Sequence, residues 1–458
     1  TPMTFDATVS GSSGQALAGP VLLDFNANPL QLTASGTWSA QGVQVSRFTS
    51  TQRDLATATG AVEIALDPFS VKEASIDATD VRFPAAYASF MQLTVATTPF
   101  NQLAATGSAT LHAGLRDDQL VQLDLTVTDL AFSDASRELK VDGVSTEVHW
   151  TRGITGPPRP SWLSWESSQG WGIVGARSRL DFTVQDREFH LTQPARLPFF
   201  DGALRINTLA AEQIGTDAMS GLFDAVIEPI SVAPIAKAMG LPEFAGQLSG
   251  RIPGLTYRDK VLSLQGNIEA DVFDGHVVAS NLRLRDPLGA WPRLYGDVVA
   301  RNLDLALLTS TFSFGSMTGR LDIDLMGLET FNWSPVAFDL VVATPKGDRS
   351  KHRISQRAVE NLSQFGGSAG GGVAAALQSP FLRFFEDFGY DRFGLSCRLR
   401  NEICQMGGAG PKGSGFYILK GKGLPRIDII GNNQIVDWPV FAAQIRDAIR
   451  NPGGIKLQ

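Results

Sequence analysis

The sequence predicts a mainly β protein with short helical caps and a C-terminal α+β module. Apolar and polar residues alternate with a period of two along most of the chain, which is typical of strands with one apolar and one polar face. Glycine (46 of 458 residues) and proline (24) interrupt these runs at short intervals, as turns between strands do. Longer helical patterns appear only towards the end. We therefore expect repeated β-modules over 1–345 and an α+β module with hairpins and amphipathic helices over 346–458.

Composition sets the outer limits of this interpretation. The chain is too long for one compact core. Hydrophobic residues make up 43% and charged residues only 19%, which argues against disorder. The net charge of −7 is spread along the chain and argues against non-specific binding of nucleic acid.

No membrane-spanning helix is predicted, because no run of about 18 uninterrupted apolar residues occurs. The chain opens with Thr1-Pro2-Met3, without an initiator methionine or a leader pattern. We expect a fragment or a processed form, with any membrane anchor upstream.

The clearest alternation runs over 261–273, which we expect to form one strand. Its apolar positions are Leu262, Leu264, Ile268, Ala270 and Val272, and the residues between them include Ser, Gln, Asn, Glu and Asp. The same pattern recurs further along the chain. The apolar positions there include Leu282, Leu284, Leu321, Ile323, Leu325, Phe338 and Leu340.

A weak internal repeat organises the strands. Each copy has a short apolar helical stretch, a linker, a glycine and then a strand. The three copies join 87–91 to Gly107, 234–239 to Gly246, and 303–308 to Gly319. The irregular spacing indicates repeated β-modules with helical caps and not a strict solenoid.

A sheet with one apolar face must cover that face. The helical pieces before residue 345 are too few to cover so many strands. A second sheet, the same sheet curled on itself as a β-helix or barrel, or an apolar ligand that is not protein could each do so. Composition does not choose among these three.

The last 113 residues read differently. A basic run over 346–357 could meet anionic lipid headgroups or could be a solvated connection. A helix is predicted over 355–365, and an aromatic amphipathic helix over 373–388 that we expect to pack as a cap at the end of the apolar face of the sheet. Asp437 should cap a final helix that carries Pro439 in its first turn.

The two cysteines, Cys397 and Cys404, lie in short alternating runs separated by the polar turn Arg400-Asn401-Glu402. Cysteines that face each other across a hairpin can meet disulfide geometry. We expect a structural disulfide in an oxidising compartment. The alternative is a pair of free, buried thiols.

Motifs for chemistry fail on context. The G-x-S-x-G match at 366–370 follows a predicted helix, whereas a nucleophile elbow follows a strand. The G-x-G-x-x-G match at 408–413 precedes a predicted strand, so no helix N-terminus would receive a pyrophosphate. The five histidines are far apart in sequence. We expect no catalytic residues, no metal site and no cofactor, and we do not expect an enzyme.

A tryptophan cluster is less clear-cut. Trp162, Trp165 and Trp171 could form a sugar-stacking platform, or they could pack a hairpin or a sheet edge.

Several segments resemble YdbH-like proteins of the AsmA/TamB superfamily. They are GRIPGLTY (250–257) with VFDG (272–275), NLDL (302–305) with LTSTFSFG (308–315), HRISQRAV (352–359), GLSC (394–397), and GLPRID (423–428) with VDWP (436–439). The resemblance is specific from about 245 to 450. Before that it rests on the general β-rich pattern.

The resemblance implies a long curled β-sheet with an open apolar groove, along which phospholipids pass as transported ligands. It implies a periplasmic bridge between the inner and outer membranes of a Gram-negative envelope. The inner-membrane anchor would lie N-terminal to this chain. A small outer-membrane lipoprotein would add a strand near the C-terminal end. On this reading the apolar positions from Leu262 to Leu340 named above, apart from Ala270, contact lipid.

Two other readings stay open. One is a structural β-rich envelope scaffold with a closed core and no lipid. The other is a β-helical polysaccharide lyase or hydrolase that uses the tryptophans and surface carboxylates.

Overall fold

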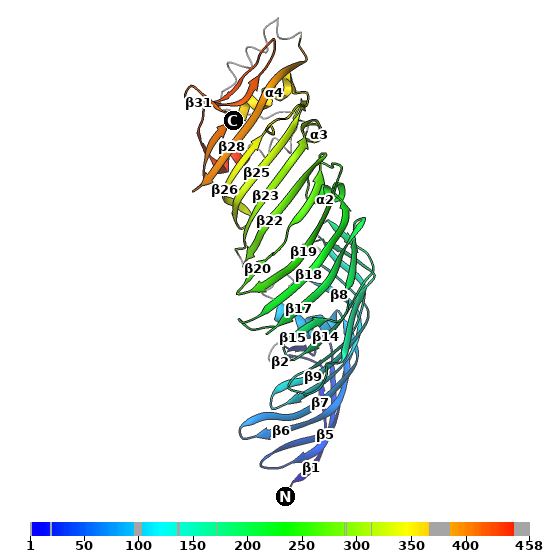
Figure 1. Ribbon diagram of the computed structural model, residues 1–458. Helices are drawn as coiled ribbons and strands as arrows, with labels where there is room; N and C mark the ends of the chain where they lie inside the picture. The colour runs from blue at the N-terminus through cyan, green and yellow to red at the C-terminus, as the bar shows by residue number, and fades with distance from the viewer. Residues whose placement is uncertain are drawn as a thin grey trace. The chain divides into compact units, whose positions relative to one another are not determined.

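The computed structural model describes residues 2–18, 21–95, 103–134, 138–170, 172–287, 289, 291–312, 314–365 and 385–443. Within these ranges the chain is mainly β, with few and short helices, as predicted (Figure 1). The chain divides into two compact units, Thr1–Gly221 and Leu222–Gln458. No helix in the described ranges is long and apolar enough to span a membrane.

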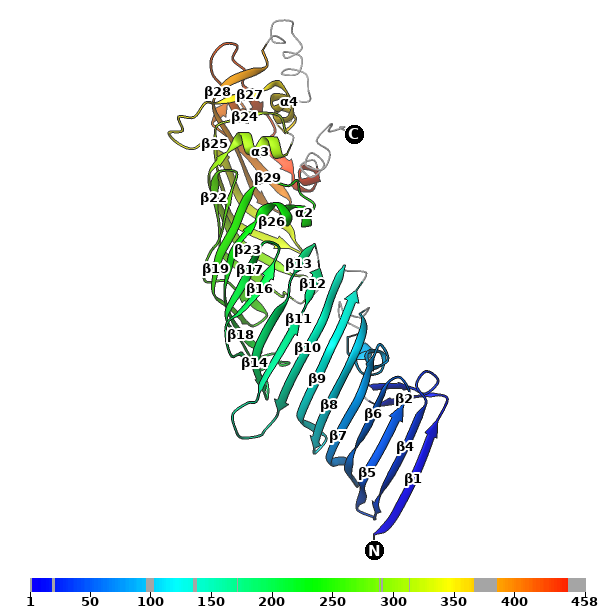
Figure 2. The same ribbon diagram turned by 90° about the vertical axis from the view of Figure 1, so that its right-hand side faces the viewer.

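The first unit is an antiparallel sheet of mostly long strands that follow one another in sequence. β1 pairs with β4, and β4 to β10 then pair in order, which Figure 2 shows as neighbouring arrows. These strands are β1 (Met3–Gly11), β4 (Leu30–Trp38), β5 (Gly42–Gln52), β6 (Ala56–Leu66), β7 (Phe69–Phe83), β8 (Ala104–Arg116), β9 (Gln119–Asp134) and β10 (Leu139–Thr151).

Shorter strands complete this unit. A separate hairpin of β2 (Gln15–Ala18) and β3 (Val21–Asp24) precedes β4. The sheet itself continues through β11 (Pro160–Trp165), β12 (Ser167–Gly170), β13 (Ile173–Gly175), β14 (Ser178–Gln185), β15 (Glu188–Leu191), β16 (Ala195–Phe199) and β17 (Gly202–Glu212). β18 (Ser220–Ser231) begins at the boundary between the units.

The second unit is also antiparallel. β19 pairs with β20 and β21, both pair with β22, and β22, β23, β25, β26, β28 and β29 then follow in order. The bounds are β19 (Gly246–Arg258), β20 (Val261–Ser263), β21 (Ile268–Val272), β22 (Gly275–Arg285), β23 (Arg293–Asp304), β24 (Met317–Thr318), β25 (Arg320–Phe331), β26 (Ser334–Ala343), β27 (Arg353–Ser355), β28 (Asp387–Arg400), β29 (Ile403–Gly408), β30 (Pro411–Lys412), β31 (Gly415–Gly421), β32 (Ile429–Gly431) and β33 (Ile435–Asp437).

The strand expected over 261–273 is two strands. β20 ends at Ser263, β21 begins at Ile268, and the residues between them, 264–267, lie outside both. Leu264 nevertheless keeps a ladder bond, because its N–H donates to the carbonyl of Leu282. The interruption lies beside a bulge in the neighbouring strand β22. Its register shifts there between Ser280 and Arg283, and Asn281 has a φ of 55°.

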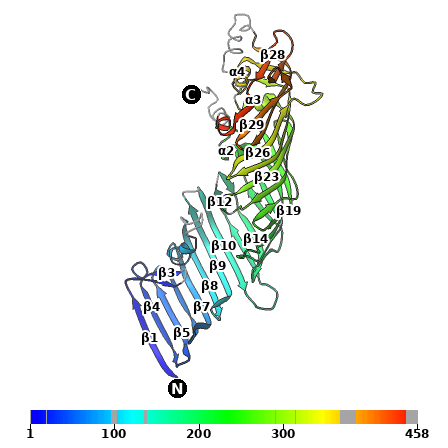
Figure 3. The same cartoon turned by 90° about the vertical axis from the view of Figure 1, so that its left-hand side faces the viewer.

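The three helical stretches of the predicted repeat all form. They are η1 (Tyr87–Met91) followed by α1 (Gln92–Val95), α2 (Val232–Ala238) and α3 (Leu305–Thr311). In the second unit, α2 and α3 follow one another along the same margin of the strands (Figure 3). Asp304 caps α3, because its carboxylate accepts hydrogen bonds from the N–H groups of Ala306 and Leu307.

The repeat glycines share one backbone conformation. Gly107, Gly246 and Gly319 have φ angles of 135°, 158° and 132°. A β-carbon on Gly319 would lie 2.6 Å from the hydroxyl oxygen of Tyr390, and one on Gly107 would lie 2.8 Å from the Cα of Leu130. Glycine is therefore required both by the dihedral and by the close approach of the neighbouring strand.

The expected boundary at residue 345 is not a break in the sheet. β26 ends at Ala343, and it pairs over six residues with β28, which begins at Asp387. The module after 345 is α+β as expected, with α4 (Gln356–Phe365) packed near β27 and β32.

The end of the chain brings one correction. The aromatic helix expected over 373–388 lies outside the described residues up to 384, and Phe388 is strand, because it pairs with Ile354 in β27. Asp437 caps the final helical residues as expected, because its carboxylate accepts a bond from the N–H of Val440.

Candidate functional site: the apolar face of the sheet

Cross-strand register places apolar residues of the first unit in rows across one face. Residues directly opposite each other in an antiparallel ladder point to the same side. One row reads Phe5, Gly36, Val45, Val62, Ala74 and Leu115. The next row reads Ala7, Ala34, Phe48, Gly60, Ile76, Ala113, Leu123 and Trp150.

β-bulges keep these rows apolar where the sequence alternation slips. In β5 the register shifts between Val45 and Phe48, and in β7 it shifts between Ala78 and Val81. An extra residue in a strand moves the following side chains to the other face. Apolar residues that are three apart in sequence therefore share one face.

One end of this face is covered by the chain itself. Leu55, Ala78, Val81, Ala86, Ala109 and Val127 form a buried cluster, against which Leu23 and Phe83 pack. Leu23 belongs to the β2–β3 hairpin and Ala86 lies next to η1, and both elements lie near the same ends of the long strands (Figure 2). This cluster is the local equivalent of a hydrophobic core.

Away from that end the face stays partly open. Phe5, Val45, Phe48, Val62 and Leu115 are all half-buried. Trp38, at the far end of β4, is 51% exposed, and Met3 opposite it is 61% exposed. The described residues thus leave a run of large apolar side chains across the middle strands without a complete cover.

The opposite face of the same strands is polar. One row there reads Thr8, Thr33, Thr49, Thr59, Asp77, His112, Asp124 and His149. His112 Nδ1 lies 2.8 Å from Asp77 Oδ1, and Arg159 Nη1 lies 2.7 Å from Asp124 Oδ1. Burial alone would raise the pKa of Asp124, but bonds from His149, Gln122 and Arg159 lower it. This face carries polar and charged side chains that water can solvate, whereas the other face carries apolar side chains.

In the second unit the eleven predicted groove residues share one face. Register places Ile268 opposite Ala279, Leu262 opposite Leu284, and Leu325 opposite Leu340. The bulge at Asn281 keeps Leu282 and Leu284 on that face. The full set is Leu262, Leu264, Ile268, Val272, Leu282, Leu284, Leu321, Ile323, Leu325, Phe338 and Leu340.

Burial divides this set. Leu321 and Phe338 are each only 3% exposed and belong to a large closed core. The other nine are half-buried. Val272 lines a cavity of about 680 Å³ with Phe244, Phe273 and Leu307. Little surface of Leu321 and Phe338 is left for a ligand, so only the nine can contact one.

The closed part is sealed by the end of the chain. The ring of Trp438 meets that of Phe338 edge-on at 5.1 Å between centroids. Trp438 also contacts Phe441, which is 6% exposed. The last described helical turn therefore packs against this closed core.

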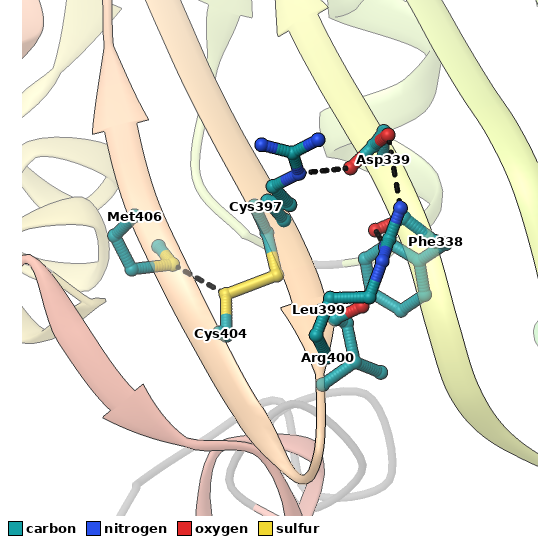
Figure 4. The surroundings of a disulfide bond; sticks show 8 residues. Phe338, Asp339, Cys397, Leu399, Arg400, Cys404 and Met406 are labelled. Atoms are coloured by element: carbon teal, nitrogen blue, oxygen red, sulfur yellow. Dashed lines mark hydrogen bonds and ion pairs between the residues drawn. A yellow bond between two sulfur atoms is a disulfide. The ribbon is translucent and has the colours of Figure 1, made fainter.

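The cysteine hairpin forms within this closed part (Figure 4). Cys397 faces Met406 and Cys404 faces Leu399, so the cysteines are diagonal neighbours on one face. The structure joins them in a disulfide with their Cα atoms 5.5 Å apart. Both are buried, with exposed fractions of 3% and 0%.

Part of the basic run at 346–357 makes contacts within this closed part. His352 Nε2 lies 2.9 Å from Asp348 Oδ2, and the His352 ring stacks on Tyr390 at 4.9 Å. Burial alone would raise the pKa of Asp348, but hydrogen bonds from Ser350, His352 and the N–H of Arg320 outweigh it and lower the pKa to about 2. Arg353 pairs with Asp387.

Other candidates from the sequence find ordinary surroundings. Trp162 lies under Arg179, whose guanidinium carbon is 4.5 Å from the ring centroid, and its Nε1 donates to Glu147. Trp171 and the G-x-S-x-G segment lie outside the described residues. In the described ranges, no three His, Cys, Asp or Glu side chains are grouped so that they could hold a metal ion.

Sequence reasoning assigned no site residue to the apolar rows of the first unit. Alanine and glycine dilute the alternation there, and the bulges change its phase within single strands. A register shift likewise sets Leu120, and not Val121, opposite Leu115. A pattern search that allowed one inserted Asp, Asn or Gly per strand would not fully detect the shared face of Val45 and Phe48. The residues between them are Ser46 and Arg47.

Comparison with protein-family models, with curated proteins and with solved structures finds no match to this chain.

Proposed function

We propose that this chain is a section of a bridge-like lipid transfer protein of the AsmA/TamB type, closest to the YdbH-like branch. In this proposal it carries phospholipids between the inner and outer membranes, with acyl chains held against the apolar face of its sheet. The observation that carries the proposal is the half-buried apolar rows across β1 and β4–β10.

A large apolar surface in water is costly, at about 25 cal/mol per Å². Among the described residues of the first unit, the β2–β3 hairpin and the segment around Ala86 relieve this cost at one end. Acyl chains would cover the rest without needing hydrogen bonds, which the side chains of Val45, Phe48 and Val62 cannot supply. A lipid layer is thus a chemically suitable cover for these rows.

Orientation follows from the two faces. Acyl chains would lie along the apolar rows, while the threonine and Asp–His row on the other side stays in water. Because the rows cross from strand to strand, the apolar surface continues from β1 to β10. A lipid could move along a surface that continues across the strands, whereas an isolated pocket could only hold a lipid in place.

The cellular setting belongs to the same proposal. The periplasm, the upstream inner-membrane anchor and an outer-membrane lipoprotein that adds a strand all come from the resemblance to YdbH-like proteins. The Cys397–Cys404 disulfide fits an oxidising compartment. No catalytic step and no cofactor enter the proposal.

A closed scaffold is the second candidate, and one observation favours it for part of the chain. The core that contains Leu321, Phe338, Leu399 and Phe441 is almost completely buried. We therefore place lipid contact in the first unit and around Ile268 and Leu284, and not at β28–β29.

The test is lipid co-purification measured by native mass spectrometry on the wild type and on Val62→Asp. Val62 lies on the apolar face, so a carboxylate there should exclude acyl chains. The matched control is Thr33→Asp, an exposed residue on the polar face of β4 that lies opposite the neutral Thr8 and Thr49.

A folded Val62→Asp that has lost its lipid, beside an unchanged Thr33→Asp, supports the conduit. A thermal melt that collapses in Val62→Asp supports a dry scaffold instead. Folded protein with unchanged lipid in both variants would contradict lipid contact at this face.

A further inference from the structure

Three turns of the second unit meet at the end of the strands opposite α3 (Figure 1). They join β19 to β20, β22 to β23, and β25 to β26. The N–H of Asp286 donates to the carbonyl of Lys260 at 2.7 Å, and the N–H of Asn332 donates to that of Pro292 at 2.9 Å. Backbone bonds therefore hold the three turns side by side before any partner arrives.

Large aromatic side chains project from these turns. Trp333 is 62% exposed, Trp291 is 59% exposed and Phe331 is 38% exposed. Trp291 and Phe331 stack with ring centroids 5.6 Å apart. We call these three residues the aromatic turn cluster. Exposed aromatic residues held together at a protruding turn are typical of an interaction site.

Trp333 also occupies an unfavourable backbone position. Asn332 and Trp333 have φ angles of 47° and 65°, which defines a two-residue turn that favours Asn-Gly. A bulky residue with positive φ is strained. In the other turns in which two successive residues have positive φ, the second residue is Asp118, Lys260, Asp274 or Glu402, and all four are polar. Trp333 is mostly exposed to solvent, so the packing of its side chain offsets little of this backbone strain.

Arginines form a row beside the cluster. Register sets Arg258 opposite Val261, Val261 opposite Arg285, and Arg285 opposite Arg293. Arg293 pairs with Glu329 at 3.1 Å and lies 5.1 Å from the ring of Phe331. Among the described residues Arg258 and Arg285 have no ion-pair partner. Like charges opposite each other on a sheet are unfavourable unless an anion sits between them.

We propose that the aromatic turn cluster and the Arg258–Arg285–Arg293 row form a membrane-surface site that takes anionic phospholipid headgroups. Indole rings favour the interface between headgroups and acyl chains. Guanidinium groups bind phosphate with two parallel hydrogen bonds. This site lies at the strand ends, so it acts whether or not lipid moves along the apolar face.

A bilayer fits better than a second copy of the chain. The chain carries a net charge of −7, and a second copy would offer an acidic surface mainly through scattered carboxylates. An anionic bilayer instead offers dense phosphate together with an apolar layer just beneath it. Both are within reach of one set of turns.

The experiment is flotation of the full chain with vesicles of phosphatidylcholine alone and of phosphatidylcholine with phosphatidylglycerol. We expect binding to the anionic vesicles that weakens as salt is raised. Arg285→Ser should lower the partition coefficient about fivefold, because each basic residue near an anionic surface contributes about that factor. Trp333→Gly should lower it by about tenfold or more, since it removes a large apolar side chain.

Trp333→Gly is a clean variant because glycine suits this turn better than tryptophan, so the fold should be retained or stabilised. The matched controls are Arg47→Ser on the polar face of β5 and Phe69→Ser at the exposed first residue of β7. Both controls should bind vesicles like the wild type.

Equal binding by wild type, Arg285→Ser and Trp333→Gly would overturn the proposal. So would a change in oligomeric state in Trp333→Gly with unchanged vesicle binding, which would assign the cluster to a second copy. Val62→Asp separates this site from the proposed conduit, because it should lose co-purified lipid and keep its vesicle binding.

Discussion

The carboxylate of Asp297 on β23 accepts a hydrogen bond from the backbone N–H of Gly327 on β25, at 2.7 Å. Its other oxygen accepts a bond from the side-chain amide of Asn281 on β22, also at 2.7 Å. Asn281 and Gly327 both have positive φ angles and mark bulges in their strands. One side chain on a middle strand thus ties together the bulges of both neighbours, and these bulges set which side chains reach the apolar face.

Removing this tie should destabilise the second unit. Asp297→Ala removes the acceptor of both hydrogen bonds, and an ordinary hydrogen bond contributes about 0.5–1.5 kcal/mol net. Urea unfolding should show that loss, whereas Asp297→Asn, which keeps a carbonyl oxygen, should lose less. Equal loss in both variants would mean that the charge, and not the acceptor geometry, matters.

Acid should weaken the closed part of the second unit through Asp348. Hydrogen bonds hold the pKa of Asp348 at about 2, below its usual value of 3.8. A carboxyl whose pKa is lower in the folded state adds stability above its unfolded pKa, and this is lost as pH falls from about 4 through about 2. Asp348→Asn should flatten this pH dependence in thermal melts. An unchanged slope between pH 4 and 2 would exclude Asp348 as its source.

The disulfide gives a chemical prediction. Thiol titration of the denatured, unreduced protein should find no free thiol, because Cys397 and Cys404 are joined. The closed loop is short, so reduction should lower the free energy of unfolding by at most about 2–3 kcal/mol. The double variant Cys397→Ser with Cys404→Ser serves as the reference that reduction should not affect. Two titratable thiols would refute the bond and weaken the proposed periplasmic location.

One introduced carboxylate should affect stability differently in the half-buried and the fully buried parts of the second unit. Ile268→Asp places a carboxylate on a half-buried position, where it can stay hydrated when lipid is absent. Leu321→Asp places one on a position that is 3% exposed, where an unpaired charge is strongly destabilising. Thermal melts should keep the first variant folded, with co-purified lipid reduced, and should unfold the second. Unfolding of both variants would make the whole face a dry core.

Glycine at the repeat position can be tested with a matched pair. Gly319→Ala adds a methyl group 2.6 Å from the Tyr390 hydroxyl at a φ of 132°. Gly410→Ala imposes a similar φ of 149° with no atom within 4 Å. The first should lower the melting temperature more, because only it adds a clash to the strain. Similar shifts would show that the dihedral alone requires glycine.

The sequence alone determined the class of the fold. Period-two alternation, frequent glycine and the polar turn between the two cysteines indicated antiparallel strands, the helical caps and the hairpin that carries Cys397 and Cys404. These signals are local, since each depends on a few neighbouring residues and on the geometry of a single strand or turn. The same local signals identified the apolar positions from Leu262 to Leu340 within each strand.

Only the tertiary structure decided which of those candidates stay accessible. Ile268 and Leu321 read alike in sequence, yet Trp438 and Phe441 help to close the core that buries Leu321, while Ile268 stays half-buried. Bulges at residues such as Asn281 likewise set the phase of each strand against its neighbour. Burial depends on residues more than a hundred positions away, and no local pattern records which distant segment will cover a face.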